Sequence, residues 1–142
     1  MRVADDIHEH VLDLTLALVN THHSGGAHER AHLYQELHDY CELVASDGRD
    51  HPFLWESLAD FTDDDLAAIG FYSRALKLAM EAGALDHQAS IRFALAQRHL
   101  EIGENAIAYG YAGQANDVAI HTGDLDLRRE ISQFLLDHST DG

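Results

Sequence analysis

Five consecutive residues in the first quarter of the chain have the types and spacing of a zinc site. Residues 28–32 read His-Glu-Arg-Ala-His, which satisfies the pattern H-E-x-x-H. In that pattern two imidazoles one helical turn apart hold Zn²⁺, while the glutamate activates a water molecule. The alternative that follows is a small zinc-dependent metalloenzyme in which His28 and His32 bind the metal and Glu29 is the base.

The helix that must carry these residues argues against that chemistry. A third ligand would have to be His38, but the zinc-protease pattern needs a glycine before it so that the chain can turn, and this chain has Gln35 there. On an uninterrupted helix His38 lies about 240° around from His32, too far to share a metal ion. His32 also points roughly 180° away from Cys41, which lies on the apolar face of the same predicted helix and is expected to face the core. We therefore expect no catalytic residue, no metal site and no cofactor. Adventitious Zn²⁺ or Ni²⁺ binding is expected at His28/His32, His8/His10 or His22/His23.

The charge balance limits the kinds of partner. The chain has nine Lys and Arg residues and 25 Asp and Glu residues, which gives a formal net charge of −16. Lys77 is the single lysine. A surface this acidic repels nucleic acid and anionic membranes and attracts basic partners. The alternative is that the charge only keeps the protein in solution.

Three further features point to a cytoplasmic protein. Cys41 is the single cysteine, so an intramolecular disulfide is excluded and a reducing compartment fits. The N-terminal residues lack the basic start and apolar run of a signal peptide. No apolar run approaches the ~18 residues that span a bilayer.

Apolar spacing predicts an all-α chain that forms a single domain. The first two predicted helices cover residues 3–22 and 27–46, and a short third helix follows Pro52. Four more helices follow. The fourth helix ends near residue 82, the last three cover residues 86–103, 104–121 and 125–138, and residues 139–142 form a frayed tail. Asp50, Thr62 and Asp86 are the predicted N-caps. The domain would combine an N-terminal helix pair (1–47) with helical repeats (51–138).

A sequence pattern in the second half of the chain repeats with a period of 40 residues. The matching pairs are Ala75/Ala115, Ala79/Ala119, Gly83/Gly123, Leu85/Leu125 and Asp86/Asp126. Such a period indicates stacked supersecondary units, here a helix closed by glycine and followed by an Asp that can cap the next helix. Small residues one turn apart let neighbouring helices approach closely.

The second copy resembles a tetratricopeptide repeat. Leu95 and Ala96 match the Leu-small pair of that family's first helix, His99 stands at its aromatic position and Gly103 in its turn. Ala108 and Ala115 match the two small positions of the second helix. The first copy is looser, with Trp55, Asp63, Ala68, Tyr72 and Ala75 at family spacing. The period exceeds the family's usual ~34 residues, and the closing proline is missing. The resemblance covers residues 51–138 and implies a protein-binding scaffold. With the N-terminal pair, the predicted helices form an antiparallel array of about seven.

In that family the first helix of each pair lines a concave groove. The resemblance therefore implies a partner-binding face made of Phe53, Ser57, Asp60 and Phe61, then Ser90, Phe93, Gln97, Leu100 and Glu101, and finally Glu130, Gln133 and Asp137. Aromatic anchors among carboxylates suit a basic or amphipathic protein segment. The alternative is that the three phenylalanines pack between helices. We expect a non-catalytic adaptor, chaperone or immunity-type inhibitor, with its oligomeric state left open.

Overall fold

The computed structural model describes residues 3–24 and 26–138, without the side chains of residues 22–24. Over this part of the chain the protein is all-α, with no strand. Its helices are α1 (Asp5–Ser24), α2 (Ala27–Ser46), α3 (Pro52–Asp60), α4 (Asp65–Ala82), α5 (Leu85–Glu101), α6 (Asn105–Ala119) and α7 (Leu125–Asp137). Within the described ranges, no helix has both the length and the apolar character that crossing a membrane requires. The tail predicted to be frayed, residues 139–142, lies outside these ranges.

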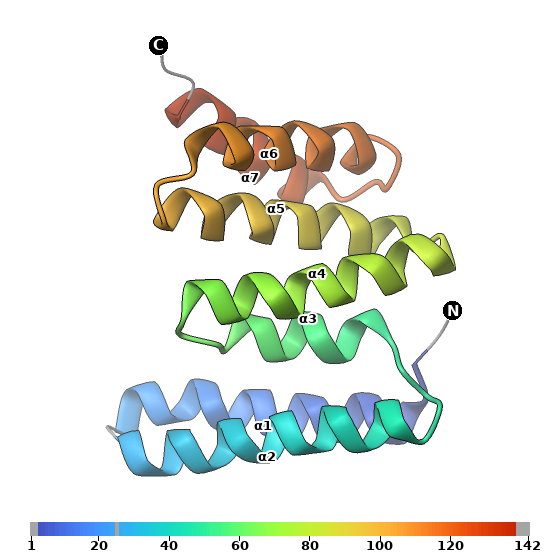
Figure 1. Cartoon of the computed structure of the whole chain (residues 1–142), viewed down its shortest axis with the longest axis vertical. Coiled ribbons are helices and arrows are strands. Elements are labelled where there is room, and N and C mark those ends of the chain that lie inside the picture. The colour runs from blue at the N-terminus through green and yellow to red at the C-terminus, as the bar shows by residue number, and fades with distance from the viewer. Residues whose placement is uncertain (1–2, 25, 139–142) are drawn as a thin grey trace.

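The helices stack as antiparallel pairs in chain order (Figure 1). α1 packs beside α2, α3 beside α4, and α5 beside α6, while α7 packs against α6. The pairs are joined by contacts of α1 and α2 with α3, and of α5 with α3 and α4. Each layer therefore touches mainly the layers before and after it, as in an α-solenoid. The predicted all-α antiparallel helix array is confirmed.

The two copies of the 40-residue sequence pattern share buried alanines and a left-handed glycine, although their helices end differently. Ala75 on α4 and Ala115 on α6 are both fully buried. Gly83 is the C-cap of α4 with φ of +66°, whereas Gly123, with φ of +77°, lies in the turn beyond Ile120, the C-cap of α6. A positive φ at the end of a helix favours glycine because glycine has no Cβ to clash.

The start of α3 differs from the prediction. Its N-cap is His51, whose Nδ1 accepts a hydrogen bond from the backbone N–H of Phe53 at 3.0 Å. Asp50, the predicted cap, instead accepts hydrogen bonds from the His51 backbone N–H (3.0 Å) and from Trp55 Nε1 (2.6 Å). Because Asp50 lies one residue before the N-cap His51, its carboxylate reaches the buried indole of Trp55 and not the backbone of the first turn.

Two other predicted caps are also wrong. Asp64 caps α4 and accepts a hydrogen bond from the backbone N–H of Ala67 at 2.9 Å, while Thr62 is buried. α5 follows Ala84, which supplies no side-chain cap, so Asp86 lies inside the first turn. There its charge still favours the helix dipole.

The buried side chains form two clusters that differ in the size of their members. The first cluster lies mainly among α1–α4 and combines large side chains with four alanines: Ile7, Val11, Leu18, Leu37, Leu54, Trp55 and Leu58 with Ala59, Ala68, Ala75 and Ala79. The second lies among α5–α7 and consists of Ala89, Ala96, Ala108, Ala112, Ala115 and Ala119 with Phe93, Ile131 and Phe134. Alanines on facing helices allow the backbones of α5 and α6 to pack closely.

α5 contributes to both clusters. Its Ile91 and Leu95 are fully buried in the first cluster, whereas Ala89, Phe93 and Ala96 belong to the second. Both faces of α5 are therefore covered, and this helix joins the two halves of the array.

A polar network around Trp55 fixes the rotation of α3. The indole is fully buried, and the guanidinium of Arg74 on α4 lies 3.6 Å from the centre of its ring. Arg74 also contacts Asp50 at 3.4 Å and Glu42 on α2 at 3.8 Å. These contacts connect α2, α3 and α4, and so decide which α3 side chains point outward.

Candidate binding groove

A hollow of about 480 Å³ lies between α1 and the C-terminal end of α3. Its lining residues are Leu12, Thr15, Leu16 and Val19 from α1, with Ser57, Asp60 and Phe61 from α3 and its C-cap. The α1 wall is largely apolar and the α3 wall is mixed. Ser57, Asp60 and Phe61 are residues that the sequence predicts for a partner groove, and the structure brings them together here.

The α1 wall is a second apolar stripe on a helix that already has one. Leu12, Leu16 and Val19 are spaced by four and three residues, so they share a face. Their exposed fractions are 46%, 62% and 43%, while the opposite stripe, which includes Ile7 and Leu18, is buried in the first cluster. Neighbouring exposed apolar side chains are typical of an interaction surface.

On the α3 wall, the carboxyl group of Asp60 has a pKa raised above its ordinary value. The residue is exposed overall, but protein atoms crowd its carboxyl group where the Tyr72 hydroxyl donates a 2.5 Å hydrogen bond. Desolvation raises the pKa of Asp60 to about 6, and the charge of Glu56 adds to the rise. The Tyr72 hydrogen bond and the Arg98 charge oppose it. Burial and the Asp60 charge also raise the pKa of Tyr72.

One turn before Asp60, Glu56 links α3 to α5. Its side chain is 18% exposed and accepts hydrogen bonds from Ser90 Oγ at 2.6 Å and from His87 Nδ1 at 2.9 Å. The bond to Glu56 raises the pKa of His87, against the opposing effect of burial. Both oxygens of Glu56 are therefore engaged with α5, and among the residues that line the groove Asp60 is the one carboxylate.

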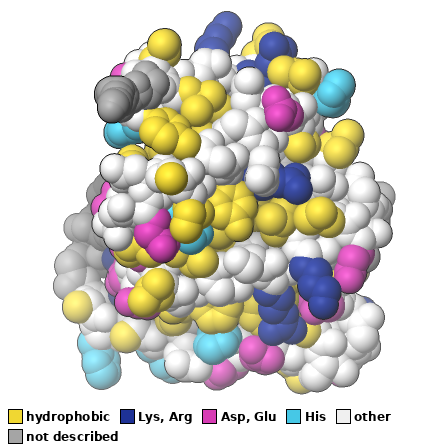
Figure 2. Space-filling view, turned by 45° about the horizontal axis from the view of Figure 1, so that its top comes forward, with side chains coloured by type: hydrophobic (Ala, Val, Ile, Leu, Met, Phe, Trp, Pro, Cys, Tyr) yellow, Lys and Arg dark blue, Asp and Glu magenta, His cyan; other side chains and the backbone are white. Residues whose placement is uncertain are grey.

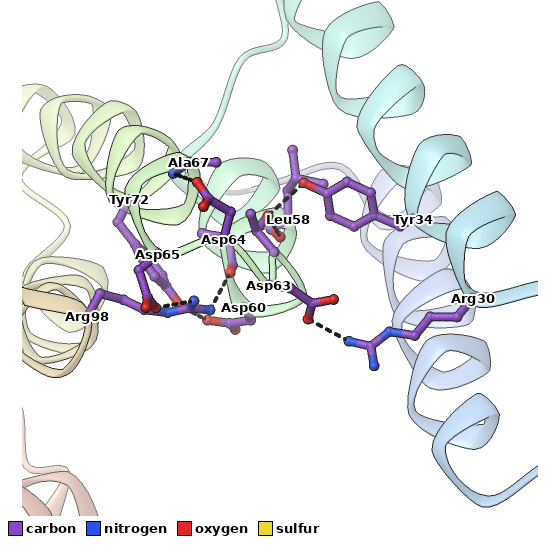
Figure 3. Close-up of polar contacts among 12 residues, drawn as sticks. Arg30, Tyr34, Leu58, Asp60, Asp63, Asp64, Asp65, Ala67, Tyr72 and Arg98 are labelled. Carbon is purple, nitrogen blue, oxygen red and sulfur yellow. Dashed lines mark hydrogen bonds and ion pairs between the residues drawn. The ribbon is translucent and has the colours of Figure 1, made fainter. Parts of the chain in front are cut away.

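The three consecutive aspartates 63–65 have separate structural partners (Figure 3). Asp63 pairs with Arg30 of α2 at 3.1 Å, and Asp64 caps α4. Asp65 pairs with Arg98 of α5 at 3.0 Å, and the same guanidinium donates to the Ala59 carbonyl at 3.2 Å. These contacts explain the acidic run without a metal ion.

A further hollow of about 660 Å³ lies between α2 and the α3–α4 turn. The Arg30–Asp63 ion pair and a 2.7 Å hydrogen bond between the Tyr34 and Thr62 hydroxyls span it (Figure 3). Phe61 lines this hollow as well as the one beside α1. The seam between the first helix pair and the rest of the array is therefore hollowed on both sides of Phe61.

The other predicted groove residues are dispersed. Phe53 is half-buried and stacks on His8 of α1, with ring centres 4.9 Å apart. Phe93 is only 6% exposed and packs edge-on against Phe134 at 5.6 Å, so it is a core residue. The remaining residues lie elsewhere: Leu100 is half-buried against the second cluster, Gln97, Glu101, Glu130 and Asp137 are exposed, and Gln133 lines a different hollow beside α6.

Sequence reasoning missed the α1 side of the groove. The spacing of Val3, Ile7, Val11, Leu14 and Leu18 predicts one buried face of this helix and leaves its other apolar residues unexplained. The missed signal was the second spacing, Leu12, Leu16 and Val19, which indicates a helix with two apolar faces.

The H-E-x-x-H residues lie along the outside of α2. His28, Glu29 and His32 are exposed, whereas His38 is half-buried, 3.7 Å from Glu42 and edge-on to Phe71. Among the described residues no group of three His, Cys, Asp or Glu side chains could hold a metal ion. The side chains of His22 and His23 lie outside the description.

Comparisons of the chain with protein-family models, curated proteins and solved structures found no match. What the fold itself defines is an all-α array of stacked antiparallel helices with a groove beside α1.

Proposed function

We propose that this protein is a non-catalytic interaction module whose α1–α3 groove binds a basic, amphipathic segment of another protein. The observation that carries the proposal is the exposed apolar row of α1, which lines one hollow together with Phe61 and the carboxylate of Asp60. The resemblance to tetratricopeptide repeats supports the same class of adaptor, chaperone or inhibitor.

The geometry of the apolar row favours a helical ligand. Leu12 and Val19 are seven residues apart, which corresponds to about 10 Å along α1. An amphipathic helix with apolar residues at positions i, i+3/i+4 and i+7 presents a row of the same length. Phe61, which is half-buried between two hollows, would form the floor under that row.

The charge of the groove favours a cationic ligand. The described residues that line it include a carboxylate but no lysine or arginine, in a chain of net charge −16. A Lys or Arg of the ligand beside Asp60 would stabilise the ionised carboxylate and lower its pKa from about 6. Binding should therefore weaken when the pH falls below 6 and when salt shortens the Debye length from ~10 Å at 0.1 M to ~3 Å at 1 M.

A designed peptide tests the proposal without knowledge of the natural partner. The probe is a Leu/Lys peptide of about five helical turns with the leucines on one face, and binding is followed by NMR on the isotope-labelled protein. We expect the largest chemical-shift changes at Leu12, Leu16, Val19 and Phe61. Leu16→Glu should weaken binding at least about tenfold, as expected for an apolar anchor.

Matched controls make the outcome decisive. Leu43→Glu makes the same change at an exposed leucine of α2 (58% exposed) and should leave the affinity unchanged. A Leu/Glu peptide of identical pattern should not bind. Equal weakening by Leu16→Glu and Leu43→Glu, or shift changes centred on another surface, would refute the groove assignment.

A further inference from the structure

The inward-facing stripe of α2 is covered by other helices over only half of its length. Its C-terminal part buries Leu37, Cys41 and Val44 in the first cluster. The same stripe continues toward the start of the helix with Tyr34 and Ala31, at spacings of three residues. Tyr34 is half-buried and Ala31 is exposed. The first half of α2 therefore stands away from the rest of the array.

The side chains of α4 that face α2 become smaller in the same direction. Arg74 lies 3.8 Å from Glu42, and one turn earlier Phe71 meets His38 with ring centres 5.5 Å apart. A further turn toward the start of α4, Ala67 lines the hollow of about 660 Å³ between α2 and the α3–α4 turn. Long side chains thus bridge the two helices at one end of the seam, and an alanine leaves them apart at the other.

The contacts at the two ends of this seam also differ in kind. Near the linker between α2 and α3, Cys41 Sγ donates a hydrogen bond to the Leu54 carbonyl at 3.4 Å, and both residues are fully buried. At the opposite end, where α2 begins and which we call the free end, Arg30 pairs with Asp63 at 3.1 Å. The side chain of Asp63 is 85% exposed, and such a pair contributes little to stability. The seam is therefore anchored at the linker and weakly held at the free end.

The linker has a defined point at which its backbone changes sides. Residues 47–49 donate backbone hydrogen bonds to carbonyl groups of residues 43–45 and so belong to the end of α2. Asp50 accepts a hydrogen bond from Trp55 Nε1 and His51 caps α3, so both belong to α3. Residues 47–49 are exposed. A few exposed loop residues of this kind can absorb the backbone rotation of a hinge.

We propose that α1 and α2 form a hinged arm, which pivots where Arg49 joins Asp50 and closes its free end onto the start of α4. Closing brings Ala31 against Ala67 and removes the hollow from water. Two alanines allow the helix backbones to approach closely. Burial of the alanines and of Phe61, which lines the same hollow, favours the closed form. The Arg30 side chain turns outward as the arm closes.

The outside of α2 gains nothing from this motion because it is polar. Glu29, His32 and Glu36 are exposed there. In Figure 2 the first helix pair forms the lower edge of the view, where His and acidic side chains lie among hydrophobic ones. The alanines of the free end, in contrast, lie on the inner side of α2, toward the hollow.

The same arm carries the apolar wall of the α1–α3 groove. α1 packs beside α2, and Phe61 lines both the groove and the hollow beside α2. Closing the hollow on one side of Phe61 should therefore widen the groove on the other side. This consequence for the groove rests on the proposed function, whereas the hinge itself does not.

Distances between pairs of spin labels test the hinge in the full chain. One pair, Glu29→Cys with Leu66→Cys, spans the free end at exposed positions of α2 and α4, and the control pair, Leu43→Cys with Lys77→Cys, spans the anchored part. Cys41 should stay unlabelled because it is buried and because burial raises the pKa of its thiol to about 12. Double electron–electron resonance should give two populations of distances at the free end and one at the control pair. A single narrow population at the free end would overturn the proposal.

A wedge variant identifies the shorter distance as the closed arm. Ala31→Phe places a ring in the hollow and should abolish the shorter population. Glu36→Phe adds the same ring on the outside of α2 and should leave both populations in place. Persistence of the shorter population in Ala31→Phe would contradict closure onto Ala67.

The link to the groove is measured separately by adding the Leu/Lys peptide. These distances in the free protein decide the hinge whether or not any peptide binds, so the two proposals can fail independently. Bound peptide should enrich the shorter distance, because closing the arm widens the groove. A peptide that binds at the groove and leaves the distances unchanged would show that the arm does not regulate it.

Discussion

The two buried clusters hold their helices together in opposite ways. In the first, large side chains such as Trp55 and Leu54 fill wide spaces between α1, α2, α3 and α4. In the second, alanines such as Ala112 and Ala115 line helices that approach closely. Two hollows lie beside Phe61, next to the first cluster, and a third lies between α6 and α7. The comparison teaches that the first cluster depends on the volume of its large side chains, whereas the second depends on the small size of its alanines.

The comparison predicts first that truncation is most harmful in the first cluster. Trp55→Ala should lower the free energy of unfolding by about 3–5 kcal/mol, because it empties a fully buried site. It also removes the hydrogen bond to Asp50 and the contact with Arg74. Urea unfolding followed by circular dichroism measures the loss. Trp55→Phe, which keeps a ring beneath Arg74, should cost clearly less, and a Trp55→Ala loss below about 1 kcal/mol would contradict the account.

Enlargement, in contrast, should be most harmful in the second cluster. Ala112→Leu should cost about 1–3 kcal/mol, since a fully buried alanine leaves no space for three more carbons. The matched control is Ala106→Leu, at an exposed position on the same helix, which should stay within about 0.5 kcal/mol of the wild type. Equal effects of the two substitutions in urea unfolding would show that the alanine layer is loosely packed.

A smaller effect should appear as a pH dependence at the groove edge. The pKa of Asp60 is about 6 in the folded protein against an ordinary value of 3.8, so between these values the folded state binds more protons than the unfolded state. The contribution of Asp60 to stability therefore falls as the pH rises from about 4 to about 6. Asp60→Asn keeps an acceptor for Tyr72 and should gain about 1 kcal/mol or less over the wild type above pH 6, because solvent screens an exposed carboxylate.

Unfolding curves at a series of pH values measure this difference. Asp117→Asn, at an exposed position of α6, removes the same charge and serves as the control. A gain of Asp60→Asn that is independent of pH would show that the hydrogen bond, and not the titration, is responsible.

The smallest effect should come from the ion pair that spans the seam. Arg30→Ala should cost about 0.2–1 kcal/mol, because the side chain of its partner Asp63 is 85% exposed. The cost should disappear near 1 M salt. A double-mutant cycle with Asp63→Ala isolates the pair. A coupling well above 1 kcal/mol would mean that the seam depends on this contact and not on apolar packing.

The fold could be predicted because several local signals agreed. The buried stripe of α1, the left-handed glycines Gly83 and Gly123 and the buried alanines of α4 and α6 all indicate stacked helices. The capping residues were less predictable. Asp50, Thr62 and Asp86 each lie near a helix start, but the exact start depends on tertiary contacts such as that between Asp50 and Trp55.

The candidate site was predictable only on one side. Ser57, Asp60 and Phe61 share a helix end, so their proximity follows from the local sequence. The opposite wall belongs to α1, and its position depends on how the first helix pair docks on the second. The spacing of apolar residues along each helix does not specify that docking. The same limit applies to Phe93, because a ring on a helix with two covered faces can point to either one.

The position of α5 between the two buried clusters has a consequence for the chain during its synthesis. Arrays whose contacts join residues close in sequence fold quickly, and N-terminal parts can form before synthesis ends. The first cluster, however, needs Ile91 and Leu95 from α5. We expect the nascent chain to remain open to proteases until that helix has left the ribosome, and to become protected abruptly before α6 and α7 emerge.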